Sequence, residues 1–142
     1  GRVRCYGDAT GGARGSAKVL GSDWDLIRGY LRDGMPNESL KGFGEQLQLM
    51  GKRSNPPERS RINAVNSRMR SGSGEIRLMV DPKHAPNVVK DFEGVRLLEG
   101  GSGEIDKKAD PKLSHISDAI GYYIHQEFPI TGYGIEVRPL RI

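Results

Sequence analysis

Hydrophobic side chains recur at helical spacing in several parts of the chain, first over 22–31. The apolar positions there are Trp24, Ile27 and Leu31. They stand at i, i+3 and i+7, which is the spacing of one face of a helix. Ser22 lies just before them, and Asp25 follows three residues later, as in a capping box. The pattern predicts an amphipathic helix.

A second helix is predicted over 55–69. Asn55 can cap its first turn, Pro56 suits its first helical position, and Glu58 completes a capping box. The apolar positions of its buried face are Ile62, Val65 and Met69. A shorter helix is predicted at the beginning of 87–98.

The last helix is predicted from Asp110 and Pro111 to about Phe128. Its apolar stripe consists of Leu113, Ile116, Ile120, Tyr123 and Ile124. At roughly 100° per residue, Asp118 projects nearly opposite the centre of this stripe. Two interpretations follow, because surface helices commonly carry a solvated aspartate on the outer face and a functional acid can occupy the same position.

Alternating apolar positions predict strands between the helices. The clearest alternation joins Ile76, Leu78 and Val80, and it predicts a strand over 75–80. Further strands are expected at 3–7, at 17–21, within 45–54 and in the tail 129–142. Since strands alternate with helices along the chain, the pattern indicates an α/β fold.

Length and composition fit a single domain. The chain has 142 residues, of which 35% are hydrophobic, enough for one core. No run of eighteen apolar residues occurs, so no membrane partner is expected. Its single cysteine, Cys5, excludes an internal disulfide, and three scattered histidines do not suggest structural zinc. The net charge of +4 favours an acidic partner such as nucleic acid. A mildly basic domain that binds no acidic partner is an equally good explanation of this charge.

Asp8 is a second candidate acid. It directly follows the first predicted strand and lies among small residues in the stretch YGDATGG, which leaves room for a phosphate backbone to approach. An aspartate that caps its own turn is the common alternative. Asp8 and Asp118 together offer the carboxylate oxygens that Mg²⁺ prefers. A pair of ions held by such acids can activate water for phosphodiester hydrolysis.

The chain resembles the C-terminal nuclease domain of the large terminase subunit of tailed bacteriophages. The matching stretches follow the order of the family over nearly the whole chain and are YGDATG, SDWDLI, NPPERSRINAVNSRM, RLMVDP, DFEGV, IDKKADPKLSHISDAIGYYI and EFP. The resemblance implies an RNase H-like α/β fold, with a mixed central sheet flanked by helices. It also implies that 1–142 is one nuclease domain of a longer motor–nuclease protein. The motor's phosphate loop, G-x-x-x-x-G-K-[ST], does not occur here, so no motor activity is expected.

The same resemblance implies a metal-dependent endonuclease that cuts concatemeric double-stranded phage DNA during genome packaging. Asp8 and Asp118 match the family's acids on the first strand and the last helix, and both would bind Mg²⁺ or Mn²⁺ as part of a two-ion site. In the implied fold, Asp118 faces the end of the first strand. The implied partners are double-stranded DNA, an ATPase motor domain, the small terminase subunit and the portal, in the host bacterial cytoplasm.

The family's middle acid is missing, because Ser60 stands at its position. Glu58, two residues earlier, is the candidate for the third catalytic and metal-binding acid, although the predicted capping box also explains it. Asp81 is a further candidate, and a turn before Pro82 explains it equally. Because of this serine, a catalytically impaired module that docks DNA or the portal is an alternative function. Another RNase H-like nuclease, such as a junction resolvase, is a further alternative.

Basic side chains surround the predicted start of the second helix. They are Lys52, Arg53, Arg59 and Arg61. We expect them to bind DNA phosphates with little base preference, and a solvated helix end is the alternative. Lys107 and Lys108, in the loop before the last helix, allow the same two interpretations. His115 is expected to orient a water or touch the scissile phosphate, and its alternative is packing or capping.

Overall fold

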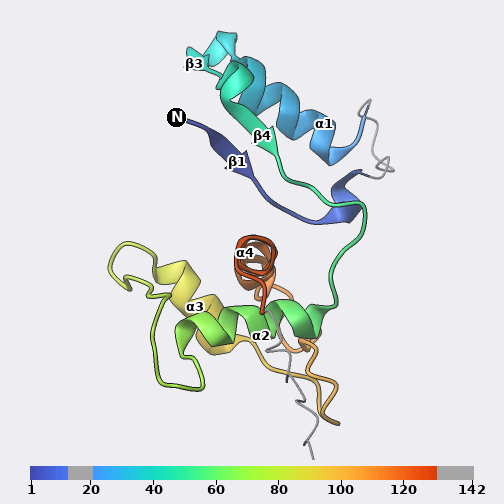
Figure 1. The fold of residues 1–142 in the computed structure, drawn as a ribbon. Helices are drawn as coiled ribbons and strands as arrows, with labels where there is room; N and C mark the ends of the chain where they lie inside the picture. The colour runs from blue at the N-terminus through green and yellow to red at the C-terminus, as the bar shows by residue number, and fades with distance from the viewer. Residues whose placement is uncertain (13–20, 131–142) are drawn as a thin grey trace, which may run out of the picture.

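In the computed structural model, two lobes lie one above the other, joined by the segment between β4 and α2 (Figure 1). The structure describes residues 1–12 and 21–130. Short strands and helices from the first half of the chain form one lobe, and three longer helices form the other. None of the helices formed by the described residues combines the length and the apolar character that a membrane crossing requires.

A short parallel strand pair organises the first lobe. β1 (Val3–Cys5) pairs with β4 (Leu47–Leu49), so strands predicted in these two places are confirmed in shorter form. Parallel strands need a crossover connection. The elements of this connection are η1 (Ala9–Gly12), α1 (Asp23–Arg28), η2 (Gly29–Asp33), β2 (Gly34–Met35), η3 (Pro36–Glu38), β3 (Leu40–Lys41) and η4 (Gly44–Gln46).

Helix α1 begins with the predicted capping box. The backbone N–H of Ser22 donates to the Asp25 carboxylate at 2.9 Å, and the Ser22 hydroxyl accepts from the Asp25 N–H at 3.3 Å. The helix continues as the π-helical turn η2 and gives way to the antiparallel β2–β3 hairpin at Gly34, where φ is +80°. A β-carbon on Gly34 would collide with the carbonyl oxygen of Leu40, so this tight hairpin requires glycine.

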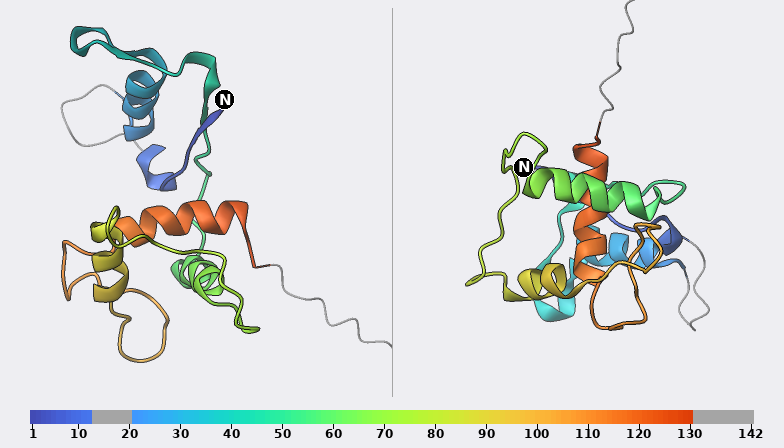
Figure 2. Two further views of the ribbon diagram at one scale, coloured as in Figure 1. Left: turned by 90° about the vertical axis from the view of Figure 1, so that its left-hand side faces the viewer. Right: turned by 90° about the horizontal axis from the view of Figure 1, so that it is seen from below.

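The second lobe consists of three helices around a small core. The helices are α2 (Glu58–Met69), α3 (Pro86–Gly94) and α4 (His115–Glu127). Helix α4 lies between the strand pair and α2, and α2 crosses it (Figure 1, Figure 2). Ala64 and Val65 of α2 and Ile124 of α4 are the buried centre of this core. Met69, Leu78, Phe92 and Ile120 pack around them.

Side chains near the end of β1 join the two lobes. The rings of Tyr6 and Tyr123 meet edge to face, with their centroids 5.1 Å apart. The Tyr6 hydroxyl donates to Glu127 at 2.8 Å, and Arg4 pairs with the same carboxylate at 3.3 Å. Tyr123, predicted in the apolar stripe of the last helix, therefore packs against the other lobe and keeps 40% of its surface exposed.

The strand predicted over 75–80 is wrong. The backbone N–H groups of Arg77 and Leu78 both donate to the carbonyl oxygen of Arg68 near the end of α2, each at 2.8 Å. Leu78 packs on the core, whereas Ile76 is exposed. Alternation of apolar residues does not by itself make a strand, because a strand also needs a neighbouring strand, and here the segment bonds to a helix end instead.

Both long helices begin later than predicted, at Glu58 and His115. The residues from Asp110 to Leu113 form turns, in which the Asp110 carboxylate accepts the Lys112 N–H at 2.9 Å. The short helix after Pro86 and the loop before α4 agree with the prediction.

The fold mixes helices with sheet, and each sheet formed by the described residues has two strands. The larger mixed sheet of an RNase H-like fold therefore stays a prediction. Most of the strand expected at 17–21, and nearly all of the tail expected at 129–142, lie outside the described residues.

Candidate functional site

Two acidic side chains from different helices converge beside the start of α4. Asp118 lies in the first turn of α4, and Glu58 is the first residue of α2. Arg61 lies with both acids, with its NH1 2.8 Å from Asp118 Oδ1 and its NH2 3.9 Å from Glu58 Oε2. The Asp118 and Glu58 side chains are only 21% and 20% exposed. Asp118 is therefore not a solvated acid on an outer helix face.

Lys107 completes the group from the loop before α4. Its Nζ lies 2.9 Å from Asp118 Oδ2 and 3.4 Å from Glu58 Oε2. The hydrogen bond to Asp118, helped by the charge of Glu58, raises the pKa of Lys107, so its side chain is an ammonium ion at neutral pH. We call Glu58, Arg61, Lys107 and Asp118 the acid–base cluster. Its two negative and two positive charges balance.

The capping box predicted for Glu58 is wrong. Pro57 precedes the helix, and no side chain caps α2. Instead, Glu58 Oε1 accepts a hydrogen bond from the backbone N–H of Ile105. Asn55, the predicted cap, donates its side-chain amide to Asp8. The bond to Ile105 ties the loop before α4 to α2, which brings Lys107 to both acids.

Arg61 anchors the cluster from within the helical lobe. Its side chain is 6% exposed, and the guanidinium lies 4.2 Å from the centroid of the Tyr122 ring, a cation–π contact. Gly121 of α4 lies directly against the Arg61 side chain, where an added β-carbon would be in ordinary contact at 3.4 Å from Arg61 Cβ. Arg61 Nε is buried and has no hydrogen-bond partner among the described residues. The contact with the Tyr122 ring and the ion pair hold the Arg61 guanidinium against Asp118.

Asp8 belongs to a separate network after the end of β1. Its Oδ1 accepts from Asn55 Nδ2 at 2.6 Å and from the Thr10 N–H and hydroxyl at 2.6 and 2.7 Å. Burial opposes ionisation, but these bonds and the nearby Tyr122 hydroxyl lower the pKa of Asp8 from 3.8 to about 2. The indole N–H of Trp24 donates to the Asp8 carbonyl at 2.9 Å. Asp8 is therefore a fixed carboxylate at neutral pH.

Tyr122 connects Asp8 with the acid–base cluster. Its ring lies against Arg61, and its hydroxyl lies near enough to the Asp8 carboxylate to lower the pKa of that group. Burial first, and then the nearby Asp8 carboxylate, raises the pKa of Tyr122 despite the opposing charge of Arg61, so the hydroxyl stays a donor. Asp118 points toward α2, and Tyr122, four residues further along α4, is the side chain that meets Asp8.

The three acids predicted as metal ligands do not converge at one point, although two of them do. Among residues 1–12 and 21–130, no group of three or more histidine, cysteine, aspartate or glutamate side chains lies close enough to hold a metal ion. Asp8 therefore does not join Glu58 and Asp118 in one such group. The latter two nevertheless share a cationic partner, because the Lys107 ammonium contacts both. Carboxylate oxygens arranged around one cation are suitable ligands for Mg²⁺.

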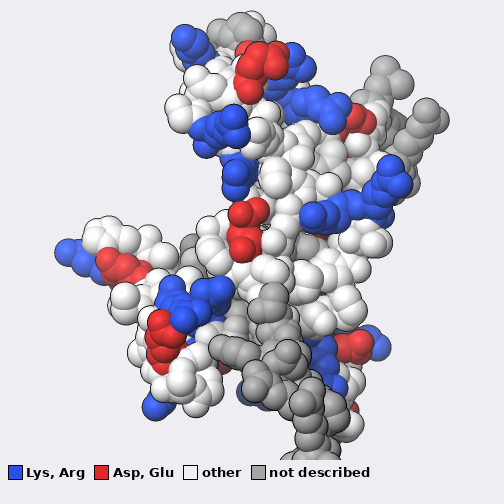
Figure 3. All heavy atoms as spheres, in the orientation of Figure 1, with Lys and Arg blue, Asp and Glu red and all other residues white. Residues whose placement is uncertain are grey.

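An open groove of about 690 Å³ lies beside Tyr122, between the segment before α2 and the C-terminal half of α4. Lys52 and Arg53 line one side of the groove, and His125 lines the other. Figure 3 shows basic side chains beside the link from β4 to α2, while acidic and basic side chains are scattered among uncharged ones elsewhere on this face. The groove thus presents positive charge next to a residue that contacts Asp8.

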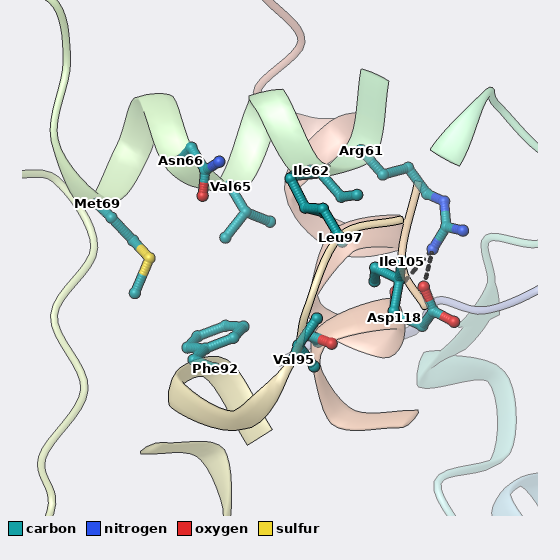
Figure 4. A pocket seen from close by; sticks show the side chains of 12 residues that line it. Arg61, Ile62, Val65, Asn66, Met69, Phe92, Val95, Leu97, Ile105 and Asp118 are labelled. Atoms are coloured by element: carbon teal, nitrogen blue, oxygen red, sulfur yellow. Dashed lines mark hydrogen bonds and ion pairs between the residues drawn. The ribbon is translucent and has the colours of Figure 1, made fainter. Parts of the chain in front are cut away.

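A smaller cavity of about 220 Å³ lies among α2, α3 and α4 (Figure 4). Met69 and Phe92 lie at one end of it, and the Arg61–Asp118 pair lies at the other. Its remaining walls are mostly aliphatic. A weakly polar wall strengthens the neighbouring ion pair, because the attraction between charges grows as the local dielectric falls.

The structure separates the basic residues predicted to bind DNA. Lys52 and Arg53 are exposed and line the groove. Arg59 is exposed beside Gly103, and His115 is exposed as the first residue of α4. Arg61 is buried in the acid–base cluster, so its guanidinium is not free for a phosphate as predicted.

Asp81 forms the turn that its sequence predicted. Its Oδ1 accepts the Lys83 N–H at 2.8 Å, and its Oδ2 lies 2.7 Å from His84 Nδ1. Both oxygens of the Asp81 carboxylate are thus used within its own turn, which explains an aspartate at this position.

Sequence reasoning gave no role to Tyr122 and left Lys107 undecided. Tyr122 lies four residues after Asp118, and this spacing, which places two side chains on one helix face, was the available signal. The position of Lys107 depends on the loop before α4, for which the sequence carries no comparable periodicity.

Comparisons with known protein families, with curated proteins and with solved structures gave no significant match to this chain. A functional assignment therefore has to rest on the acid–base cluster, the groove and the sequence motifs.

Proposed function

We propose that this chain is a divalent-metal-dependent endonuclease domain that hydrolyses phosphodiester bonds of double-stranded DNA. The observation that carries the proposal is the convergence of Glu58 and Asp118, from two different helices, on one cation, the Lys107 ammonium. Acids brought together in this way provide the oxygen ligands of a Mg²⁺ or Mn²⁺ site.

Each acid has a distinct part in the proposed reaction. Glu58 and Asp118 would hold the ion, which would supply activation of water and charge stabilisation of the departing oxygen. Arg61 binds Asp118 Oδ1 and leaves Oδ2 for the cation. Asp8 is ionised and lies near the Tyr122 hydroxyl, which supports its proposed role as a further catalytic and metal-binding acid, with a second ion, near the groove.

The groove supports DNA as the substrate. Lys52 and Arg53 are exposed on it and would bind phosphates, which fixes the register of the duplex without reading its sequence. His125, on the opposite side, adds a further donor.

The sequence motifs support a place in phage genome packaging. Their order resembles the terminase nuclease domain, whose proposed substrate here is concatemeric DNA. The proposed partners are the ATPase motor domain, the small terminase subunit and the portal, in the host cytoplasm.

A second function, a non-catalytic module that docks DNA or the portal, is favoured by a specific observation. Ser60 stands where the family has an acid, and Arg61 and Lys107 neutralise the two acids that do converge. A balanced charge cluster of this kind also serves to fix helices relative to one another.

Nicking of supercoiled plasmid in the presence of Mn²⁺ distinguishes the two functions. We expect the chain to nick DNA, Asp118→Asn and Glu58→Gln to abolish nicking, and Asp81→Asn, which alters an exposed turn, to leave it intact. DNA binding without nicking by the unaltered chain would instead identify the docking module.

A further inference from the structure

We propose that the side chain of Lys107 blocks the Glu58–Asp118 site, so that a divalent ion binds only after this ammonium has withdrawn. The inference rests on the proposed function, because it concerns the same two acids. It adds a residue that controls when the metal enters.

The position of the ammonium is the first argument. Lys107 Nζ lies 2.9 Å from Asp118 Oδ2 and 3.4 Å from Glu58 Oε2. Mg²⁺ binds carboxylate oxygens at about 2.0–2.1 Å, so an ion shared by these oxygens would occupy nearly the same place. The lysine and the ion therefore exclude each other.

The charge balance is the second argument. With Lys107 in place, the two acids are neutralised by Arg61 and Lys107, and nothing in the cluster attracts a further cation. Withdrawal of Lys107 leaves the cluster with a net negative charge. That charge favours a cation, and a divalent ion gains more from it than a monovalent one.

Arg61 and Lys107 differ in their freedom to leave. The Arg61 side chain is 6% exposed, stacked on Tyr122 and bonded to Asp118. The Lys107 side chain is 50% exposed and extends from a loop. A lysine has a flexible stem and a strongly hydrated head, so Lys107 can turn into solvent while Arg61 stays and holds Asp118.

Binding of Mn²⁺, measured by isothermal titration calorimetry on the whole chain without DNA, tests the inference. We expect Lys107→Gln to bind Mn²⁺ on the order of ten-fold more tightly than the unaltered chain. The full unscreened attraction would predict more, but a half-exposed charge is screened by water.

Three variants serve as controls. Lys108→Gln removes the same charge from the neighbouring exposed residue, for which the structure shows no side-chain contact with the acids, and should bind as the unaltered chain does. Lys107→Arg keeps the charge and should keep binding weak. Adding Asp118→Asn to Lys107→Gln should abolish the gain, which locates the ion in the cluster. Circular dichroism in EDTA verifies that each variant is folded.

The outcomes separate the two proposals. Equal Mn²⁺ affinities for the unaltered chain and folded Lys107→Gln would overturn the blocking role and leave the metal site in place. Absence of binding to every folded variant, Lys107→Gln included, would overturn both the block and the metal-dependent function.

Discussion

Asp8 and Asp118 are held by different kinds of donor. Asp8 receives hydrogen bonds from neutral groups of Asn55 and Thr10. Asp118 is bound by the two cations of the acid–base cluster. Neutral donors keep Asp8 ionised without cancelling its charge, so a cation approaching Asp8 displaces no salt bridge. For Asp118, in contrast, a cation can approach only after the Lys107 ammonium has moved away.

The lowered pKa of Asp8 predicts a specific pH dependence of stability. The pKa falls from 3.8 to about 2 on folding, so the stabilisation is fully present above the unfolded value. It is lost as the pH drops from about 5 toward 2. Urea unfolding should therefore show the stability difference between the unaltered chain and Asp8→Asn shrinking over this interval.

The Asn55→Ala variant tests whether Asn55 causes the lowered pKa of Asp8. Loss of the amide donor should move the pKa of Asp8 back toward 3.8, as followed by the carboxyl carbon shift in NMR. A titration of Asp8 near pH 2 in this variant would show that Asn55 does not hold the carboxylate.

Single residues were the part of the site that the sequence predicted best. Glu58 and Asp118 were both named as candidate acids, and the structure brings them together through Lys107. The surroundings of Asp8 were missed, because Asn55 suited a helix cap and the competing bond to Asp8 spans 46 intervening residues of the chain, a relation that no local pattern encodes.

At the scale of elements, the start of α4 depends on another helix. Ser114, in the N-cap position, has φ +76° and makes no side-chain capping bond. The Asp91 carboxylate of α3, with 2% of the residue exposed, accepts the N–H groups of Ile116 and Ser117 at 3.3 and 3.2 Å. A carboxylate at a helix N-terminus satisfies free donors and complements the helix dipole. Asp91 thereby fixes where the helix that carries Asp118 and Tyr122 begins.

Asp91→Ala should lower the free energy of unfolding by about 1–2 kcal/mol, the usual effect of losing a helix cap. Urea denaturation followed by circular dichroism measures the loss. Glu93→Gln, on an exposed position of the same helix, should change stability by less than about 0.5 kcal/mol. Equal effects of the two substitutions would mean that Asp91 does not cap α4.

Helix positions were predictable because periodicity is local, and the capping box of α1 was predicted as well, but the starts of α2 and α4 were not. Asp110 looked like the first residue of the last helix, yet its carboxylate bonds to the Lys112 N–H in its own turn, and α4 begins at His115. The cap that matters comes from Asp91, 24 residues before that start. Tertiary partners of this kind decide a boundary that propensities leave open.

At the scale of the whole molecule, charge is distributed unevenly despite a net charge of only +4. Acidic and basic side chains are scattered among uncharged ones on the face in Figure 3, whereas Lys52 and Arg53 lie together on the groove. We therefore expect any binding of a polyanion to depend on this local patch. The separation of the chain into two lobes, which no composition value indicates, creates this groove along the segment that joins them.

Lys52→Gln combined with Arg53→Gln should weaken DNA binding and reduce its salt dependence. Each lost phosphate contact lowers the slope of log K against log salt by about 0.9, so the pair should lower it by about 2. Fluorescence anisotropy with labelled duplex DNA in EDTA, over a series of salt concentrations, measures the slope. Lys83→Gln with Lys90→Gln, which removes the same charge at exposed positions in and before α3, should leave it unchanged. An unchanged slope in the first pair would remove the groove as the DNA surface.

The single tryptophan of the chain, Trp24, donates its indole N–H to the backbone of Asp8 and lies close to Gly7, Gly11 and Gly51. Indole emission responds to the polarity around the ring, so the molecule carries its own optical reporter next to a candidate acid. A cation or strand end that shifted the Asp8 turn would alter this emission without any attached dye, and events at Asp8 could be timed separately from those in the helical lobe.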